Sequence, residues 1–477
     1  MIVPIDEALL TVDPDKIDLD DKIATKALFV SALNTLESFA QEIIRLREEN
    51  QNLKNEIAYL KGEKGKPQIK PSVPTEESKA PKVKPKTWKK RSKKDRVKVD
   101  RTVEVPMEDP MPADAKFLGF RRVIIQDMKI QTDNVEYLLP RYYSPSQKKY
   151  YDAKLPKEVR GSEFGPHLKA WIAVLYFACR VTENKIHQFL NEIGISISEG
   201  QISNIITKEK HQELTSEKES IFAAGMRKAS YVQTDDTSAR HKGKNLNMHV
   251  VCNSHFTCYS ILNSKKRDDI RTMFGLKDGE KLKIPLITDG AKQYIDIVII
   301  HALCWIHEIR HYIKITPYFG YHKKILEAFM EELYGFYNLL LQFKFIANDA
   351  EEIDTTRVAT LKAEILSKFD ELFFHKHTDY VDLNRRLALT WENRDSLLKV
   401  LDYPFIPLHN NESEIAAREP VIKRKISYGT RSELGKAAWE NMLSIKDTCR
   451  KTGVSFYKYM LDIYSNSFNL PRLAALI

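Results

Sequence analysis

The sequence contains no run of about 18 or more uncharged apolar residues, which is the length that a membrane-spanning helix needs. Its N-terminus carries acidic residues and lacks the basic segment and apolar stretch of a secretion signal. Cysteine is scarce, and an odd number of scattered cysteines does not support a disulfide framework. The five are Cys179, Cys252, Cys258, Cys304 and Cys449. We therefore expect a cytoplasmic protein with reduced thiols and no membrane partner.

The charge balance points to polyanionic partners. The 477 residues carry a formal charge of +10, and 43% of them are hydrophobic. Such a chain is long enough for roughly two to four domains with a sizeable core. A basic balance favours DNA, RNA or an anionic membrane surface without distinguishing them, so the distribution of charge along the chain has to decide.

Residues 1–62 are predicted to form a dimerising coiled coil. From Phe29 to Leu60 apolar residues repeat at heptad spacing, with one Asn50 at a core position. A buried asparagine of this kind costs stability but fixes the register and favours a parallel dimer. The predicted dimerisation residues are Ile43, Leu46, Asn50, Leu53, Ile57 and Leu60. The alternative is an amphipathic helix that folds against the same chain.

Residues 63–99 are rich in proline, lysine and serine and poor in apolar residues, which predicts a disordered linker. Its second half is strongly basic and suits phosphate contact without sequence specificity. The predicted DNA-binding residues there are Lys89, Lys90, Arg91, Lys93 and Lys94. The alternative is a solvated linker with no binding role.

Residues 100–160 alternate apolar and polar side chains, as in Arg121–Asp127 and Val135–Tyr143. This pattern predicts short antiparallel strands. No cysteine lies in this segment, so packing alone would have to hold it together. We interpret it as a small β-rich DNA-binding segment without zinc ligands.

Residues 161–225 are predicted to contain three short helices, with Gly194 at a tight corner and Ser198 capping the last helix. Their order suggests a helix-turn-helix-like domain. In such a domain the last helix would present Gln201, Ser203 and Asn204 to DNA. A purely structural helical subdomain is the alternative, because this helix is not basic.

The region from residue 226 to 435 has the pattern of an α/β catalytic domain. Strands are predicted at 231–237, 246–253, 257–262, 283–288 and 296–303, with a helix at 267–274. This order matches an RNase H-like fold, in which the first and fourth strands are neighbours. A long helical stretch at 320–402 is predicted to be an insertion, and 436–477 a C-terminal helical module.

Three carboxylates lie where the predicted strands and helix of this region can bring them together. Asp235 and Asp289 follow strand-like runs, and Glu414 lies in a segment that is predicted to be helical. Two divalent ions about 3.5 to 4 Å apart need such a cluster of oxygen ligands to cleave a phosphodiester. Asp236 and Glu412 are the rival ligands. Taken singly, each acid also has the simpler interpretation of a strand-end or helix-capping carboxylate.

Several motifs resemble those of transposases of the insertion sequence 66 family. They are Asp235-Asp-Thr237, Thr288-Asp-Gly290, the set Cys304, Trp305, His307 and Arg310, then Asn410, Asn411 and Glu414, and lastly Arg424, Lys425 and Gly429-Thr430. The resemblance spans nearly the whole chain and implies a DDE-type catalytic domain of RNase H-like fold. One departure is His409, which stands where the family has an aspartate.

The resemblance implies a DNA transposase with catalytic and metal-binding residues Asp235, Asp289 and Glu414. Two Mg²⁺ or Mn²⁺ ions would bind there. The expected partners are element ends, target DNA, a second copy of the chain and accessory proteins of the same element, in a bacterial, nucleoid-associated setting. The predicted DNA-contacting residues of this domain are His307, Arg310, Arg418, Lys423, Arg424 and Lys425.

Three alternatives remain open from the sequence. A zinc site of Cys304, His307 and His311 is one, although zinc is not expected because Trp305 fits the family motif. A dimeric DNA-binding regulator with an inactive core is the second, and a nuclease of RNase H-like fold that cuts without joining is the third.

Overall fold

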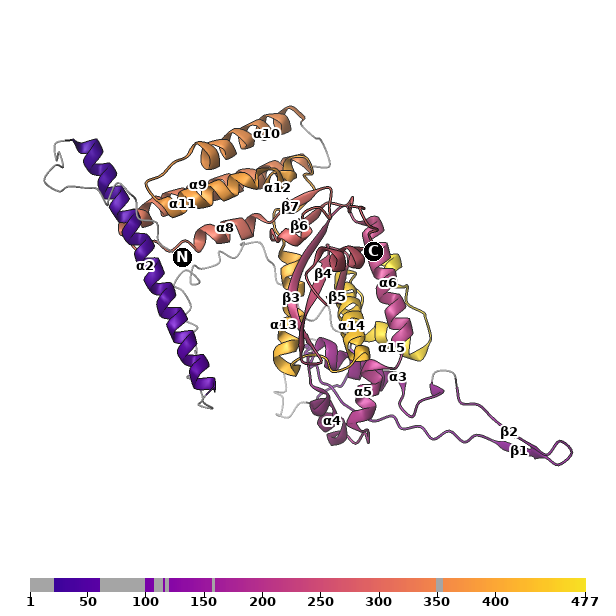
Figure 1. Cartoon of the computed structure of the whole chain (residues 1–477). Coiled ribbons are helices and arrows are strands. Elements are labelled where there is room, and N and C mark those ends of the chain that lie inside the picture. The colour runs from indigo at the N-terminus through magenta and orange to yellow at the C-terminus, as the bar shows by residue number, and fades with distance from the viewer. Residues whose placement is uncertain (1–20, 61–98, 107–114, 116–119, 157–158, 349–354) are drawn as a thin grey trace. The chain divides into compact units, whose positions relative to one another are not determined.

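The computed structural model describes residues 21–60, 99–106, 115, 120–156, 159–348 and 355–477 (Figure 1). Two compact units are distinguished, one of residues 1–47 with 135–477 and one of residues 48–134. Within the described residues, no helix combines the length and the apolar character that crossing a bilayer requires.

The larger unit contains a five-stranded mixed sheet in the order β5–β4–β3–β6–β7. Its strands are β3 (Val232–His241), β4 (Lys244–Cys252), β5 (Thr257–Leu262), β6 (Leu286–Thr288) and β7 (His301–Leu303). The first three pair antiparallel, whereas β6 pairs parallel with both β3 and β7. The predicted adjacency of the first and fourth strands is confirmed. The fifth strand is shorter than predicted, and Val298 joins Leu282 only by an isolated bridge.

One hydrophobic core joins this sheet to helices from before and after it in the chain. α13 (Asn411–Ser427) packs against β3 and β4, and α14 (Glu433–Lys451) packs against β5 and α6 (His211–Lys228) (Figure 1). The other helices around the sheet are α3 (Pro166–Ala173), α4 (Glu183–Glu192), α5 (Glu199–Thr207), α7 (Arg267–Phe274), α15 (Phe456–Ser465) and α16 (Leu473–Leu476). The helices α3 to α6, which precede the sheet, and α14 to α16, which follow it, therefore share one core with the sheet.

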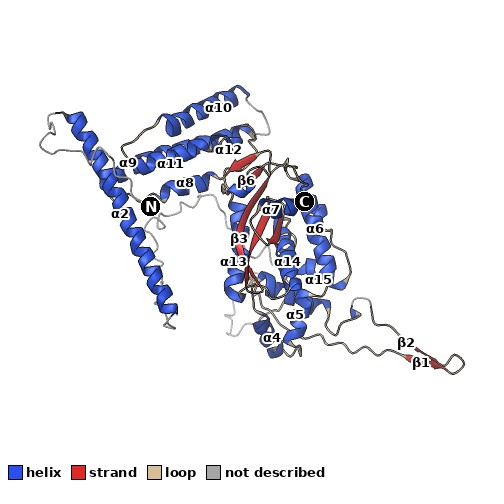
Figure 2. Cartoon of the chain, in the orientation of Figure 1, coloured by secondary structure: helices blue, strands red, loops and turns tan. Residues whose placement is uncertain are grey.

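Between β7 and α13 the described chain is helical, as Figure 2 shows. The main helices are α8 (Trp305–Ile313), α9 (Gly320–Ala347), α10 (Thr355–Asp370), α11 (Val381–Glu392) and α12 (Arg394–Leu397). The buried indole of Trp305 donates from Nε1 to the Leu397 carbonyl over 2.9 Å. Its ring contacts Phe336 and Phe369 in a second core. Trp305 thus fixes the start of α8 within these helices.

The first half of α2 (Lys22–Leu60) packs against the same helices. Glu37 and His322 are both buried, and Glu37 Oε2 lies 3.1 Å from His322 Nδ1. Asn34 donates to the Asp379 carbonyl over 2.9 Å and accepts from the Val381 backbone N–H over 3.0 Å. This half of α2 therefore folds against its own chain, as the alternative interpretation of the heptads anticipated.

The heptad residues lie on a part of α2 that stays open to solvent. The side chains of Ile43 and Leu46 are 49% and 50% exposed, and Leu53, in the smaller unit, is 53% exposed. Asn50 is also exposed. The side chains of Ile57 and Leu60, and the whole of residues 61–98, lie outside what the structure describes, so the basic residues from Lys89 to Lys94 do as well.

The segment before the helices forms one antiparallel hairpin, β1 (Arg141–Ser144) with β2 (Lys149–Asp152). The prediction of a strand at Arg121–Asp127 is wrong, because this stretch has no regular structure. Alternation requires a partner strand and a covering layer to become a stable strand. Here Val123 and Ile125 are exposed.

Candidate active site on two parallel strands

Asp235 and Asp289 are placed by the register of β3 and β6. Gln233 pairs with Ile287 across the two parallel strands, and each acid follows its paired residue by two positions. Adjacent strands lie about 4.8 Å apart. Asp235 lies within β3, and Asp289 is the first residue after β6. The pairing therefore brings the two acids to the same part of the sheet.

Glu414 reaches this region through the first turn of α13. Asn410, at the N-cap of this helix, donates from Nδ2 to the Thr234 carbonyl over 2.8 Å. The Glu412 backbone N–H donates to Gln233 Oε1 over 3.2 Å. Both bonds end on strand residues immediately before Asp235, so they join the start of α13 to the part of β3 that carries this acid. The strand continues past Asp235 to His241, so the prediction that the acid stands at the end of its strand is wrong.

The neighbouring acids act on the pKa of Asp235. Burial raises the pKa of Asp235 to about 6, and the negative charges of Asp289, Asp236 and Glu414 contribute to the rise. The Asp236 backbone N–H donates to Asp235 Oδ1 over 2.8 Å and acts in the opposite direction. Three mutually repelling carboxylates at one place are the arrangement that a cation would relieve.

The rival acids Asp236 and Glu412 each have a lysine partner, which Asp235 and Asp289 lack in the described ranges. Lys265 forms an ion pair with Asp236, and Lys451 forms one with Glu412 over 3.2 Å. Among the described residues, no ion pair is found for Asp235 or Asp289. Within the part of the chain that the structure describes, Asp289 Oδ1 accepts only from the Ala291 backbone N–H, over 3.1 Å. The oxygen atoms of Asp235 and Asp289 are thus the ones left for an external cation.

The α8 motif lies against Glu414. Arg310 Nη1 is 3.0 Å from Glu414 Oε2, and His307 Nδ1 is 3.6 Å from Glu414 Oε1. Donor atoms of Cys304, His307 and Glu414 all lie within 4.8 Å of one another, which is true of no other such group among the described residues. The acidic triad of Asp235, Asp289 and Glu414 is not such a group, so its carboxylate oxygens do not all lie within 4.8 Å of one another. His311 is exposed and is not in the group.

The predicted basic cluster on α13 is partly wrong. Arg418 and Lys425 are exposed, and Arg424 donates from Nη1 to Ser238 Oγ over 2.5 Å. Lys423, in contrast, is buried, with Nζ 3.4 Å from the centre of the Tyr176 ring. It also donates to the Tyr176 carbonyl over 3.1 Å. Lys423 therefore holds α13 against the segment around Tyr176, just after α3, and is not available for DNA contact.

The α5 residues chosen as DNA contacts are only partly accessible. The predicted cap is confirmed, since Ser198 Oγ accepts from the Gln201 backbone N–H over 3.2 Å. Gln201, Ser203 and Asn204 are all half-buried. Gly194 has a φ of +85°, as predicted for the corner before the helix. The assignment of Gln201, Ser203 and Asn204 to DNA contact stays a prediction.

Sequence reasoning missed the residues that support the Thr-Asp-Gly turn. Thr288 Oγ1 lies 2.8 Å from His301 Nε2 and accepts from the Gly290 backbone N–H over 3.1 Å. Burial lowers the pKa of His301 to about 4, so its ring is neutral at pH 7. Gly290 has a φ of +100°, which favours glycine. The Thr-Asp-Gly motif pointed to Thr288 and Gly290, but no sequence pattern predicted the contact between Thr288 and His301.

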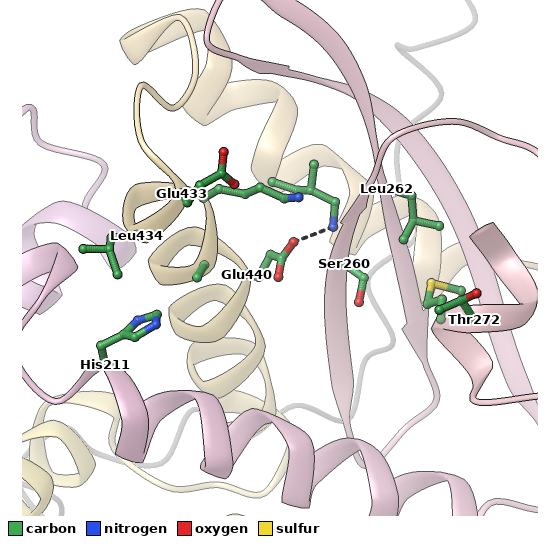
Figure 3. A pocket seen from close by; sticks show the side chains of 11 residues that line it. His211, Ser260, Leu262, Thr272, Glu433, Leu434 and Glu440 are labelled. Atoms are coloured by element: carbon green, nitrogen blue, oxygen red, sulfur yellow. Dashed lines mark hydrogen bonds between the residues drawn. The ribbon is translucent and has the colours of Figure 1, made fainter.

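A pocket of about 480 Å³ lies elsewhere on the sheet domain (Figure 3). Residues of α6, β5, α7 and α14 line it, and the Ile261 backbone N–H donates to Glu440 Oε1 over 2.7 Å at its edge. None of the acidic triad contributes to it.

Comparison with known proteins identifies the family. A family model described as "Transposase IS66 family" matches residues 161–438. The chain belongs to the IS66 transposase family. The match covers the helices before the sheet, the sheet itself, the helices at 320–402 and α13, so all three members of the acidic triad lie within the IS66 region.

One curated relative is similar to part of the chain. It is the uncharacterized protein y4jO of Sinorhizobium fredii (strain NBRC 101917 / NGR234), which is 36% identical over 177 residues. The matched stretch covers 37% of this chain and 51% of the relative, so the chain spans about half of that protein's length.

Proposed function

We propose that the chain is a DDE-type DNA transposase that cleaves the ends of its element and joins them to target DNA. The observation that carries this proposal is the register of β3 and β6, which sets Asp235 beside Asp289 without a basic partner among the described residues. Family membership supports a nucleic-acid-processing enzyme. The strand order and directions support an RNase H-like assignment for the sheet.

The acidic triad fits hard divalent cations. Its donors are carboxylate oxygens, which Mg²⁺ and Mn²⁺ prefer. When bound, two such ions supply the Lewis acidity that activates an attacking water or 3′-hydroxyl and stabilises the leaving oxygen. Asp235, Asp289 and Glu414 would hold them. Asn410 positions Glu414 relative to β3 through its bond to the Thr234 carbonyl.

The remaining residues of the site are suited to DNA contact. Arg310 pairs with Glu414 over 3.0 Å. If bound cations neutralised that carboxylate, the guanidinium would be free to contact a DNA phosphate instead. Arg418 and Lys425, both exposed on α13, are assigned to the DNA backbone. His307, Arg424 and the α5 residues Gln201, Ser203 and Asn204 complete the proposed DNA-binding set.

The β1–β2 hairpin is a second proposed DNA contact. All four of its tyrosines are exposed, and Arg141 and Lys149 lie over the rings of Tyr150 and Tyr151 at 5.4 and 5.6 Å. A two-stranded ribbon with exposed rings and cations suits DNA grooves and unstacked bases. This supports residues 100–160 as a DNA-binding segment without zinc ligands.

Homodimerisation through α2 is proposed from the exposure of its heptad residues. Its heptad residues Ile43, Leu46 and Leu53 remain about half exposed although the first half of the helix is anchored through Glu37. A parallel second copy would cover them. Accessory proteins of the element, the domain boundaries and a nucleoid location stay predictions.

The test uses the purified full chain, DNA labelled at the ends that flank its gene, a target plasmid and Mg²⁺. Metal-dependent cleavage and joined products from the parent, both absent from Asp289→Asn, are the expected result. Cleavage without joined products would instead identify a nuclease. Tight binding with neither reaction would identify a DNA-binding regulator.

A further inference from the structure

A second group of metal-ligating side chains lies beside the acidic triad and is not explained by it. Cys304 Sγ, a nitrogen of His307 and a carboxylate oxygen of Glu414 lie within 4.8 Å of one another. Cys304 and His307 are three positions apart at the start of α8, and Glu414 comes from α13. A thiol has no use in a site for Mg²⁺, which takes oxygen ligands.

Two atoms of this group lack hydrogen-bond partners among the described residues. His307 Nδ1 and Glu414 Oε1 are buried and, among the described residues, neither accepts or donates a hydrogen bond. They lie 3.6 Å apart. Ligand atoms at about 2.0 to 2.3 Å from a tetrahedral Zn²⁺ are separated by about 3.3 to 3.7 Å. The two unpartnered atoms are therefore already spaced as neighbouring ligands of such an ion.

The surroundings of Cys304 suit a metal-bound thiolate. The Asn410 backbone N–H donates to Cys304 Sγ over 3.2 Å. The Cys304 side chain is buried. A bound cation removes the cost of burying the thiolate and leaves the N–H donor in place.

We propose that Cys304, His307 and Glu414 form a binding site for a thiophilic divalent cation of the Zn²⁺ class. The thiolate, His307 Nδ1 and Glu414 Oε1 supply three ligands, and a water or phosphate oxygen takes the fourth position. Binding at Nδ1 leaves the ring proton on Nε2. Arg310 Nη1, 3.5 Å from Nε2, would then no longer donate to the ring, and Glu414 Oε2 at 3.0 Å would remain its partner.

This site goes beyond the proposed transposase chemistry and does not require it. It differs from the zinc set considered from the sequence, because Glu414 replaces the exposed His311 as third ligand. Since Glu414 also belongs to the acidic triad, a thiophilic ion bound here occupies one carboxylate of the candidate active site.

The experiment titrates the untagged, metal-free full chain with Co²⁺ and records its absorption spectrum. We expect one bound Co²⁺ per chain with a thiolate-to-cobalt charge-transfer band, which added Zn²⁺ abolishes by displacement. Cys304→Ser should lose the band, and the half-exposed His307→Ala should bind at least about tenfold more weakly. Cys179→Ser is the matched control, because Cys179 is an exposed cysteine outside the group, and it should keep the band.

The proposal is overturned if the parent shows no charge-transfer band, or if the band persists in a folded Cys304→Ser protein. Should that variant fail to fold, unchanged affinity in His307→Ala overturns it instead. Asp289→Asn separates the two proposals, since it should keep the cobalt band and lose DNA cleavage. A parent that cleaves DNA without the band contradicts this site alone, and one with the band that does not cleave contradicts the transposase proposal alone.

Discussion

Asn410 Nδ2 donates to the carbonyl of Thr234 over 2.8 Å, which ties the helix that carries Glu414 to the residue preceding Asp235. Asn410 is fully buried, so its side chain is a fixed link between the two parts of the acidic triad.

We predict that Asn410→Ala lowers the DNA cleavage rate by about 10- to 100-fold, because a small displacement of Glu414 spoils the geometry of the reacting groups. The unpaired Thr234 carbonyl should also cost about 1–3 kcal/mol of unfolding free energy. Cleavage kinetics and thermal denaturation measure the two effects. Asn411→Ala is the control, since Asn411 is the exposed neighbour. Equal rates for the two variants would exclude a positioning role for Asn410.

The raised pKa of Asp235 predicts a pH-dependent stability. Its pKa rises from 3.8 to about 6 in the folded chain, which therefore holds this proton more tightly than the unfolded chain does. The contribution of Asp235 to stability is then fully present below pH 3.8 and is lost as the pH rises through about 6. A shift of this size corresponds to at most about 3 kcal/mol, reduced to about 1–2 kcal/mol because the side chain is partly exposed.

Asp235→Asn should accordingly be about 1–2 kcal/mol more stable than the parent at pH 7 with a chelator present, and equally stable near pH 3. Thermal denaturation across this pH range measures the difference. Adding Mg²⁺ at pH 7 should stabilise the parent and leave the variant nearly unchanged, because a ligand stabilises only the state that binds it. A constant difference at all pH values would show that Asp235 does not titrate as described.

The exposed heptad residues predict a dimer that one charge disrupts. Leu46→Asp should convert a dimer into a monomer, because it places a carboxylate in the seam beside Ile43 of the second copy. Sedimentation equilibrium of the full chain measures the mass. Glu48→Asp, at an outward heptad position two residues further along the helix, should leave the dimer intact. A monomeric parent would favour the alternative in which α2 serves only its own chain.

The hairpin contact predicts an effect of Lys149 on DNA affinity and its salt dependence. Lys149→Gln should weaken binding to all sequences alike and reduce the slope of log K against log salt by about 1. Fluorescence anisotropy at several salt concentrations gives both quantities. Lys368→Gln removes an exposed lysine from α10 and should change neither. An unchanged slope in Lys149→Gln would remove the hairpin from the DNA interface.

Much of the fold follows from local pattern. The strands around Asp235 and Asp289 were predictable because β-branched runs end at these acids, and the order of elements predicted that their strands are neighbours. The strand at Arg121–Asp127 failed because alternation does not show whether a partner strand exists.

The surroundings of the site were less predictable, because they depend on contacts between distant residues. Arg310 and Glu414 are 104 positions apart, and no spacing rule relates them. Lys423 belonged to a basic run, yet the ring of Tyr176 covers it. The lysines that occupy Asp236 and Glu412 likewise become visible only when the chain is folded.

The most direct test compares five conservative variants in the Mg²⁺-dependent cleavage of labelled element ends. Asp235→Asn, Asp289→Asn and Glu414→Gln should each reduce cleavage by at least about 1,000-fold, because each removes a carboxylate that holds the ions. Asp236→Asn and Glu412→Gln should retain cleavage within about tenfold, because lysines already occupy these rival acids. Loss of cleavage in Asp236→Asn or Glu412→Gln together with retention in any of the other three would contradict the proposed acidic triad.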